Sequence, residues 1–126
     1  MTDYYVGDLC YVMLEDWDEI VDQTVYDNSK LSYQLADGRE YFSVSTMYGD
    51  GSYSDTLGNP YSVDSGTIGA IKVADIANTD ALVSALVEGL GHVITFDHEL
   101  TSDEVYSEAG QINIGSVVID TDDLEY

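Results

Sequence analysis

The sequence predicts an α+β fold: a largely antiparallel sheet, able to curl toward a barrel, with two short amphipathic helices on one face. Two observations support this class. Gly, Asn and Asp recur between short apolar runs from residue 31 to 71, as they do in the turns of antiparallel hairpins. Segments 16–26 and 79–90 instead space their apolar residues at helical period. The expected order is therefore strand, helix, five-strand meander, helix and two or three further strands.

The first predicted element is a strand over Tyr4–Leu14, which is apolar at nearly every position and is therefore expected to be buried on both faces. Gly7-Asp8 marks a bulge or bend within it. Cys10 is the only cysteine and has no basic neighbour in the sequence, so it is interpreted as a small core residue rather than a nucleophile. A single cysteine also fits a reducing compartment.

A helix is predicted over 16–26, with Asp16 as its cap and Glu19 completing a capping box. Its apolar stripe comprises Trp17, Ile20, Val21, Thr24 and Val25. The opposite face is acidic. Trp17 is interpreted as a core anchor, although a tryptophan at the start of a helix can also be a central contact with a partner.

Four turns define the register of the predicted meander. They are the two-residue turns Asp37-Gly38, Gly58-Asn59 and Ser65-Gly66, and the three-residue loop Gly49-Asp50-Gly51. Counting outward places Tyr33 opposite Phe42, and Tyr53 opposite Asp64. One face is then apolar: Leu31, Tyr33, Phe42, Val44, Thr46, Tyr61, Val63, Ile68 and Ala70. The other face, expected to meet solvent or a partner, carries Tyr41, Ser45, Tyr53, Asp55, Ser62, Asp64 and Thr67; a slip of one residue would exchange the two faces.

A second helix is expected to begin at Asn78 or Thr79 and to end near Gly89 or Gly91. Its inner face comprises Leu82, Ala85, Leu86 and Leu90. Strands are predicted within 91–100 and 111–120. A single domain is expected to span residues 1–121, followed by an acidic tail over 122–126.

The charge is extreme: 25 acidic residues against Lys30, Arg39 and Lys72 give a net charge of -22. Such a surface repels both a phosphate backbone and an anionic membrane, so direct binding to nucleic acid or membrane is not expected. A basic protein is the expected kind of partner. The sequence contains no apolar run of about 20 residues and no signal peptide, so a cytoplasmic location is expected.

The candidate binding residues are Tyr48, Asp50, Tyr53, Asp55 and Asp64. In the predicted register Asp55 and Asp64 are diagonal neighbours across the Gly58-Asn59 hairpin, and Asp50 tops the adjoining loop. Paired carboxylates can perform acid/base chemistry or hold a hard cation. With 25 acidic residues, however, some carboxylates must be neighbours by chance, and a solvated acidic face is the simpler interpretation.

His92 and His98 are expected on one side of a strand and about 20 Å apart, too far to share a metal. They are interpreted as ordinary strand residues. The sequence contains no phosphate-cradling glycine motif, nucleophile elbow or cysteine-histidine cluster. No catalytic residue, metal or cofactor is therefore assigned, and a non-enzymatic role is favoured.

The segments YVGDLCYVM, YGDGSY and YSVDSGTIGAI resemble small acidic proteins of phages and marine metagenomes. The resemblance implies a viral accessory protein inside a host cell and implies no activity. The first functional hypothesis is therefore an acidic protein that docks on a basic protein, with DNA-like charge mimicry as one form of it. The alternatives are a small enzyme or cation-binding domain that uses Asp50, Asp55 and Asp64, and a salt-adapted domain whose charge has no partner.

Overall fold

The computed structural model describes residues 1–26 and 31–125, which contain two α-helices, ten strands and three short 3-10 helices. The helices are α1 (Trp17–Tyr26), α2 (Thr79–Val87), η1 (Leu9–Tyr11), η2 (Val73–Asp75) and η3 (Ser102–Glu104). The strands are β1 (Thr2–Gly7), β2 (Ser32–Gln34), β3 (Glu40–Ser45), β4 (Gly51–Asp55), β5 (Pro60–Val63), β6 (Thr67–Lys72), β7 (Gly91–Phe96), β8 (Val105–Glu108), β9 (Gln111–Ile114) and β10 (Val117–Glu125).

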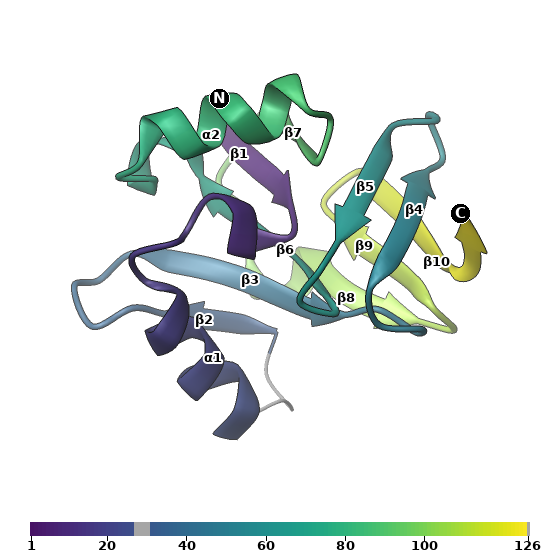
Figure 1. Cartoon of the computed structure of the whole chain (residues 1–126), viewed down its shortest axis with the longest axis horizontal. Coiled ribbons are helices and arrows are strands. Elements are labelled where there is room, and N and C mark those ends of the chain that lie inside the picture. The colour runs from purple at the N-terminus through teal and green to yellow at the C-terminus, as the bar shows by residue number, and fades with distance from the viewer. Residues whose placement is uncertain (27–30, 126) are drawn as a thin grey trace.

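The strands form two antiparallel sheets of five strands each (Figure 1). Sheet 1 has the order β2-β3-β6-β1-β7, and sheet 2 has the order β5-β4-β10-β9-β8. The two sheets approach each other where the Ser62 N–H donates to the Leu90 carbonyl at 3.2 Å. The predicted α+β class with a largely antiparallel sheet and two short helices is confirmed. The described strands form no closed barrel.

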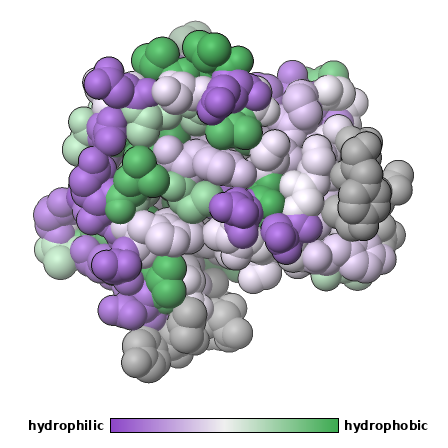
Figure 2. Space-filling model, viewed as in Figure 1, coloured by the Kyte–Doolittle hydropathy of each residue, from purple (hydrophilic) through white to green (hydrophobic). Residues whose placement is uncertain are grey.

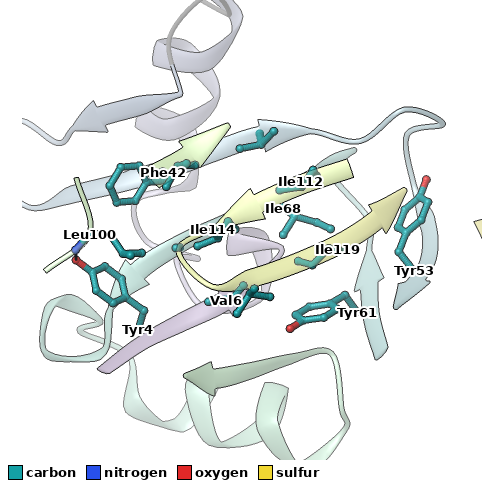
Figure 3. Packing of buried hydrophobic residues seen from close by; sticks show 14 of the residues in the cluster. Tyr4, Val6, Phe42, Tyr53, Tyr61, Ile68, Leu100, Ile112, Ile114 and Ile119 are labelled. Atoms are coloured by element: carbon teal, nitrogen blue, oxygen red, sulfur yellow. Dashed lines mark hydrogen bonds between the residues drawn. The ribbon is translucent and has the colours of Figure 1, made fainter. Parts of the chain in front are cut away.

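The main core lies between the two sheets, where side chains from both inner faces pack together (Figure 3). Sheet 1 and the loop after it contribute Tyr4, Val6, Phe42, Val44, Ile68, Ala70, Phe96 and Leu100. Sheet 2 contributes Tyr53, Tyr61, Val63, Val105, Ile112, Ile114, Val117 and Ile119. Period-two alternation in the strands supplies these residues, as expected for strands with one face against a core.

A second core lies between the other face of sheet 1 and the helices. Its buried members are Tyr5, Leu9, Val12, Met13, Ile20, Leu35, Tyr41, Ile71, Ile76, Leu82 and Ala85. Sheet 1 is therefore covered on both faces, and the molecule has three layers: helices, sheet 1 and sheet 2. This explains why β1 and β6 are apolar at successive positions.

The predicted meander is wrong as a single sheet. After β3 the chain crosses to sheet 2, forms the β4–β5 hairpin, and returns as β6 beside β3. The Thr46 N–H donates to the Gly66 carbonyl at 3.0 Å, so the two crossing segments run together. The turn residues at 49–51 and 65–66 therefore do not close hairpins between consecutive strands. They bend two adjacent segments from one sheet toward the other.

The β2–β3 and β4–β5 hairpins do form, but each has a three-residue loop in place of the predicted two-residue turn. Leu35 N–H donates to the Arg39 carbonyl at 2.8 Å, and the loop ends on Gly38 with φ of 100°. The second loop repeats the pattern: Asp55 N–H donates to the Asn59 carbonyl at 3.0 Å, and Gly58 has φ of 88°. Glycine thus supplies the left-handed third position of each loop.

These loops change the register and exchange the faces of several residues. Tyr33 lies opposite Tyr41, and Tyr53 lies opposite Tyr61. Tyr33 therefore packs on the helix side rather than with Phe42, and Tyr41, predicted to face outward, is 1% exposed. Tyr53 and Asp55 were also expected on the outer face, but both are buried. The remaining apolar face, including Val44, Ile68 and Ala70, is confirmed because it follows from alternation within each strand.

Both predicted helices are confirmed, with one difference at a cap. Asn78 caps α2, since its side chain accepts a hydrogen bond from the Ala81 N–H at 2.9 Å. At α1, the Asp16 side chain bonds Arg39, and Glu19 accepts a hydrogen bond from the Ala36 N–H at 2.7 Å. The two residues predicted to form a capping box therefore attach α1 to the β2–β3 hairpin instead.

The first strand and the C-terminal segment also differ from their predicted extents. The strand expected over Tyr4–Leu14 stops at Gly7, and Asp8 caps η1 directly after it. At the other end, β10 continues through residues 122–125 of the predicted tail, and Glu125 lies opposite Ser52.

Candidate functional site

The three carboxylates expected to form a site do not lie together. Asp50 and Asp64 are exposed, next to the first and last paired residues of the β4–β5 hairpin. Asp55 is at the loop end of the same hairpin, about 13 Å further along the strand. The register error explains the difference, since the predicted pairing would have made Asp55 and Asp64 diagonal neighbours.

Asp55 has a structural role in the β4–β5 loop. Its Oδ1 accepts hydrogen bonds from the N–H groups of Leu57 and Asn59, and its Oδ2 accepts from the Asn59 side chain and the Tyr61 hydroxyl, all at 2.9–3.0 Å. Burial opposes ionisation of this carboxyl, but these donors outweigh it and lower the pKa of Asp55. Burial and the adjoining carboxylate raise the pKa of Tyr61.

The two predicted binding tyrosines differ in position. Tyr48 is 55% exposed, on the loop between β3 and β4. Tyr53 is buried, and its hydroxyl donates to the Gly49 carbonyl at 2.9 Å, which holds that loop. Thr121 also holds it, accepting a hydrogen bond from the Met47 N–H at 3.1 Å. Tyr53 therefore positions the loop that carries Tyr48 and Asp50 rather than contacting solvent.

A buried carboxylate that sequence reasoning missed lies at Asp8, which is 0% exposed. Its Oδ2 accepts from the N–H groups of Asp64 and Ser65 at 2.8 and 2.7 Å. Its Oδ1 accepts from the Cys10 N–H at 3.0 Å and the Ser65 hydroxyl at 2.7 Å. The Gly-Asp pair at the strand end was the only local signal, because the partners at 64–65 are more than 50 positions away in the sequence.

A half-open groove of about 390 Å³ lies between α1 and sheet 1, beside this carboxylate. Trp17, Ile20, Val21 and Thr24 of α1 form one wall. Four hydroxyl residues, Ser43, Ser45, Ser65 and Thr67, form the floor and the other wall. The described lining contains no charged side chain. The helical stripe at 17, 20, 21 and 24 was predicted to be core, whereas part of it faces this groove.

Four exposed carboxylates belong to the segments that line the groove or adjoin it, and we call them the acidic rim: Asp18, Asp22, Asp50 and Asp64. Asp18 and Asp22 are one turn apart on α1 and follow the lining residues Trp17 and Val21 in the sequence. Asp64 directly precedes the lining residue Ser65. Asp50 lies on the adjacent crossing segment, whose Gly49 approaches Gly66. Of the predicted binding residues, Asp50 and Asp64 thus lie on segments next to the groove, whereas Tyr53 and Asp55 are buried and do not line it.

The described basic side chains are held by carboxylates. Arg39 donates to Asp16 and Asp37 at 2.8–2.9 Å, and Lys72 is paired with Glu99. Among the side chains of residues 1–24 and 31–121, no carboxylate of the acidic rim takes part in a hydrogen bond or ion pair.

The two histidines lie apart and have different surroundings. His92, on β7, has its Nε2 2.6 Å from the Pro60 carbonyl oxygen and packs edge-on against Tyr61. His98 follows β7 and is held between Glu104, at 2.7 Å from Nε2, and Asp97 at Nδ1. The hydrogen bonds that His98 makes to Glu104 and Asp97 raise its pKa. Both ring nitrogens are engaged, so His98 links these two neighbours.

Cys10 is half-buried beside Asp8. Burial and the negative charge of Asp8 raise its pKa far above the usual thiol range. The thiol is therefore not activated for nucleophilic chemistry, in agreement with its interpretation as a packing residue.

Val83 and Val87 are exposed and lie one turn apart on α2. Hydrophobic side chains gather on the surface at the edge of the molecule where α2 lies (Figure 2). Asp80 and Glu88 border the two valines and are exposed. Two valines give far less area than the roughly 800 Å² per partner of a stable protein interface.

Within the described residues, no group of three or more His, Cys, Asp or Glu side chains is placed to hold a metal ion. None of the helices in that part of the chain is long and apolar enough to span a bilayer. Comparison with protein-family models, curated proteins and solved structures gave no match.

Proposed function

We propose that this protein is a non-enzymatic interaction protein that docks on a basic protein through the acidic rim and the groove inside it. The observation that carries the proposal is the negative charge beside the groove. Asp18, Asp22, Asp50 and Asp64 are exposed on the segments that line or adjoin it, while Arg39 and Lys72 are bound to other carboxylates. Complementary charge accelerates association and selects the partner.

The distribution of charge favours general attraction of a basic partner over mimicry of DNA. Exposed carboxylates occur on both helices, on several loops and on β8, as well as on the rim. A mimic of DNA needs its carboxylates in rows along one face. A broad negative field instead orients any basic partner from a distance, and the concave groove offers it a place to bind.

Two alternatives have less support. A cation site or enzyme built on Asp50, Asp55 and Asp64 would need these side chains together, whereas Asp55 lies at the far end of the hairpin and is held by four donors. A salt-adapted protein would carry the same charge without a partner, and the experiment below separates it from docking. The proposed setting is the cytoplasm, that of the host if the chain is viral, which suits the single cysteine.

The test compares two sets of four neutralised carboxylates. The rim set is Asp18→Asn, Asp22→Asn, Asp50→Asn and Asp64→Asn. The control set is Asp80→Asn, Glu88→Gln, Asp103→Asn and Glu108→Gln, which changes the charge equally at exposed positions on α2, at its C-terminal cap, on η3 and on β8.

A basic partner is first captured from bacterial lysate at low salt, and its association rate with each variant is then measured. The rim set should slow association about tenfold, and the control set should slow it much less. Urea unfolding of all variants shows whether they remain folded. Failure to retain any basic protein at low salt, or equal rates for the two sets, would contradict docking at the rim and favour salt adaptation.

A further inference from the structure

The donor and acceptor roles of the Ser65 and Thr67 hydroxyls are fixed by a chain of hydrogen bonds that begins at the Asp8 carboxylate. Three backbone N–H groups point at the Asp8 carboxylate, and the Ser65 hydroxyl donates its proton to Oδ1 at 2.7 Å. The Ser65 and Thr67 oxygens are 2.8 Å apart. Since the Ser65 proton is already directed to Asp8, Thr67 must be the donor in this contact. Both oxygens therefore offer the groove lone pairs and no proton.

Thr24, on the helical wall, has the same polarity. Its hydroxyl donates to the Ile20 carbonyl at 2.9 Å, so its oxygen is also left as an acceptor. Trp17 also lines the groove, and an indole is the aromatic ring that attracts cations best.

Ser43 adds a further hydroxyl to the groove. The residue is 8% exposed and its side chain is part of the lining. A group that enters the groove can hydrogen-bond to this hydroxyl.

We infer that the groove binds an arginine side chain of the basic partner, with its guanidinium between Trp17 and the hydroxyl floor. This inference rests on the proposed function and names the contact that docking would use. A guanidinium has five N–H donors and no acceptor, which matches a surface of acceptors. It is weakly hydrated and stacks on aromatic rings, whereas a lysine ammonium is compact and strongly hydrated.

Other ligand classes fit less well. An anion would meet oxygen lone pairs inside an acidic rim. A neutral sugar can pair with the hydroxyls of Ser43 and Ser45, but it carries no charge to balance the acidic rim. The groove is at the lower end of the size range of ligand sites, which suits a single long side chain.

Trp17 is the only tryptophan, so its fluorescence reports on the groove directly. The test uses three labelled peptides with lysines at both ends and arginine, lysine or citrulline at the centre. Citrulline keeps the shape of arginine without its charge. Label anisotropy reports binding anywhere on the protein, and Trp17 emission reports occupation of the groove.

The arginine peptide should bind at low salt with a change in Trp17 emission, and about fivefold or more tightly than the lysine peptide. Thr67→Val keeps the side-chain shape but removes an acceptor, and should abolish most of this preference while leaving the lysine peptide unaffected. Ser45→Val, on the neighbouring strand position, should act in the same direction by narrowing the groove. Because Ser45 is exposed, this substitution should leave the protein folded.

The two readouts separate this inference from the proposed function. Anisotropy changes without any change in Trp17 emission would overturn the groove inference and leave acidic docking in place. Equal affinity for the arginine and citrulline peptides would contradict recognition of the guanidinium group. A change in Trp17 emission with a neutral oligosaccharide as large as that with the arginine peptide would contradict it as well. No anisotropy change with any cationic peptide at low salt would contradict both proposals.

Discussion

Replacing Asp8 with asparagine should destabilise the fold by about 3 kcal/mol. The N–H groups of Asp64 and Ser65 converge on Oδ2, so the amide oxygen must stay there and the amide nitrogen takes the Oδ1 position. The Cys10 N–H then loses its acceptor, at a cost of about 1–3 kcal/mol. The remaining hydrogen bonds change from charge-assisted to neutral, and each weakens by about 1 kcal/mol or less.

The assay is urea unfolding followed by Trp17 fluorescence, with the slope of the transition used to confirm that only stability has changed. Asp64→Asn is the matched control: it removes the same charge from an exposed side chain and keeps the backbone N–H that contacts Asp8. Its effect should stay within about 0.5 kcal/mol. If Asp8→Asn changes stability no more than this control, the role of Asp8 in joining β1 to the 64–65 segment is refuted.

The other predictions concern register, pH and salt. Tyr41→Ala should cost about 3–5 kcal/mol, as much as Phe42→Ala, because Tyr41 is buried and its hydroxyl donates to Gln23; a small loss in urea unfolding would restore the predicted register. His98 has a raised pKa, so its contribution to stability is present below about pH 6.5 and is lost as pH rises through the folded-state value; His98→Gln should remove this dependence from urea midpoints measured between pH 6 and 8.5. Asp55 has a lowered pKa, so its contribution is present above about pH 4 and is lost on further acidification; Asp55→Asn should flatten the acid limb of a pH titration. Stability of the parent protein should rise between low salt and about 0.5 M NaCl, and equal urea midpoints would show that repulsion among its carboxylates is negligible.

The sequence alone determined the features that depend on local periodicity and composition. Alternation placed Val44, Ile68 and Ala70 on one buried face, and the helical spacing located α1 and α2 within a few residues. These predictions hold because a strand or helix presents its faces by its own geometry, whatever its neighbours are. The net charge likewise needs no structure, and it was the basis for expecting a basic partner.

Only the tertiary structure decided how the strands pair and which side chains meet. Gly38 and Gly58 signalled turns, but a glycine fits a two-residue turn and the third position of a longer loop equally well, and the choice reversed Tyr33, Tyr53 and Asp55. The groove depends on a contact between residues that are still further apart in the sequence, because the Asp8 carboxylate accepts the hydroxyl proton of Ser65. A contact of that separation leaves no local pattern in the sequence, since it is formed where β1 and β6 pair within sheet 1 rather than by the propensities of either segment.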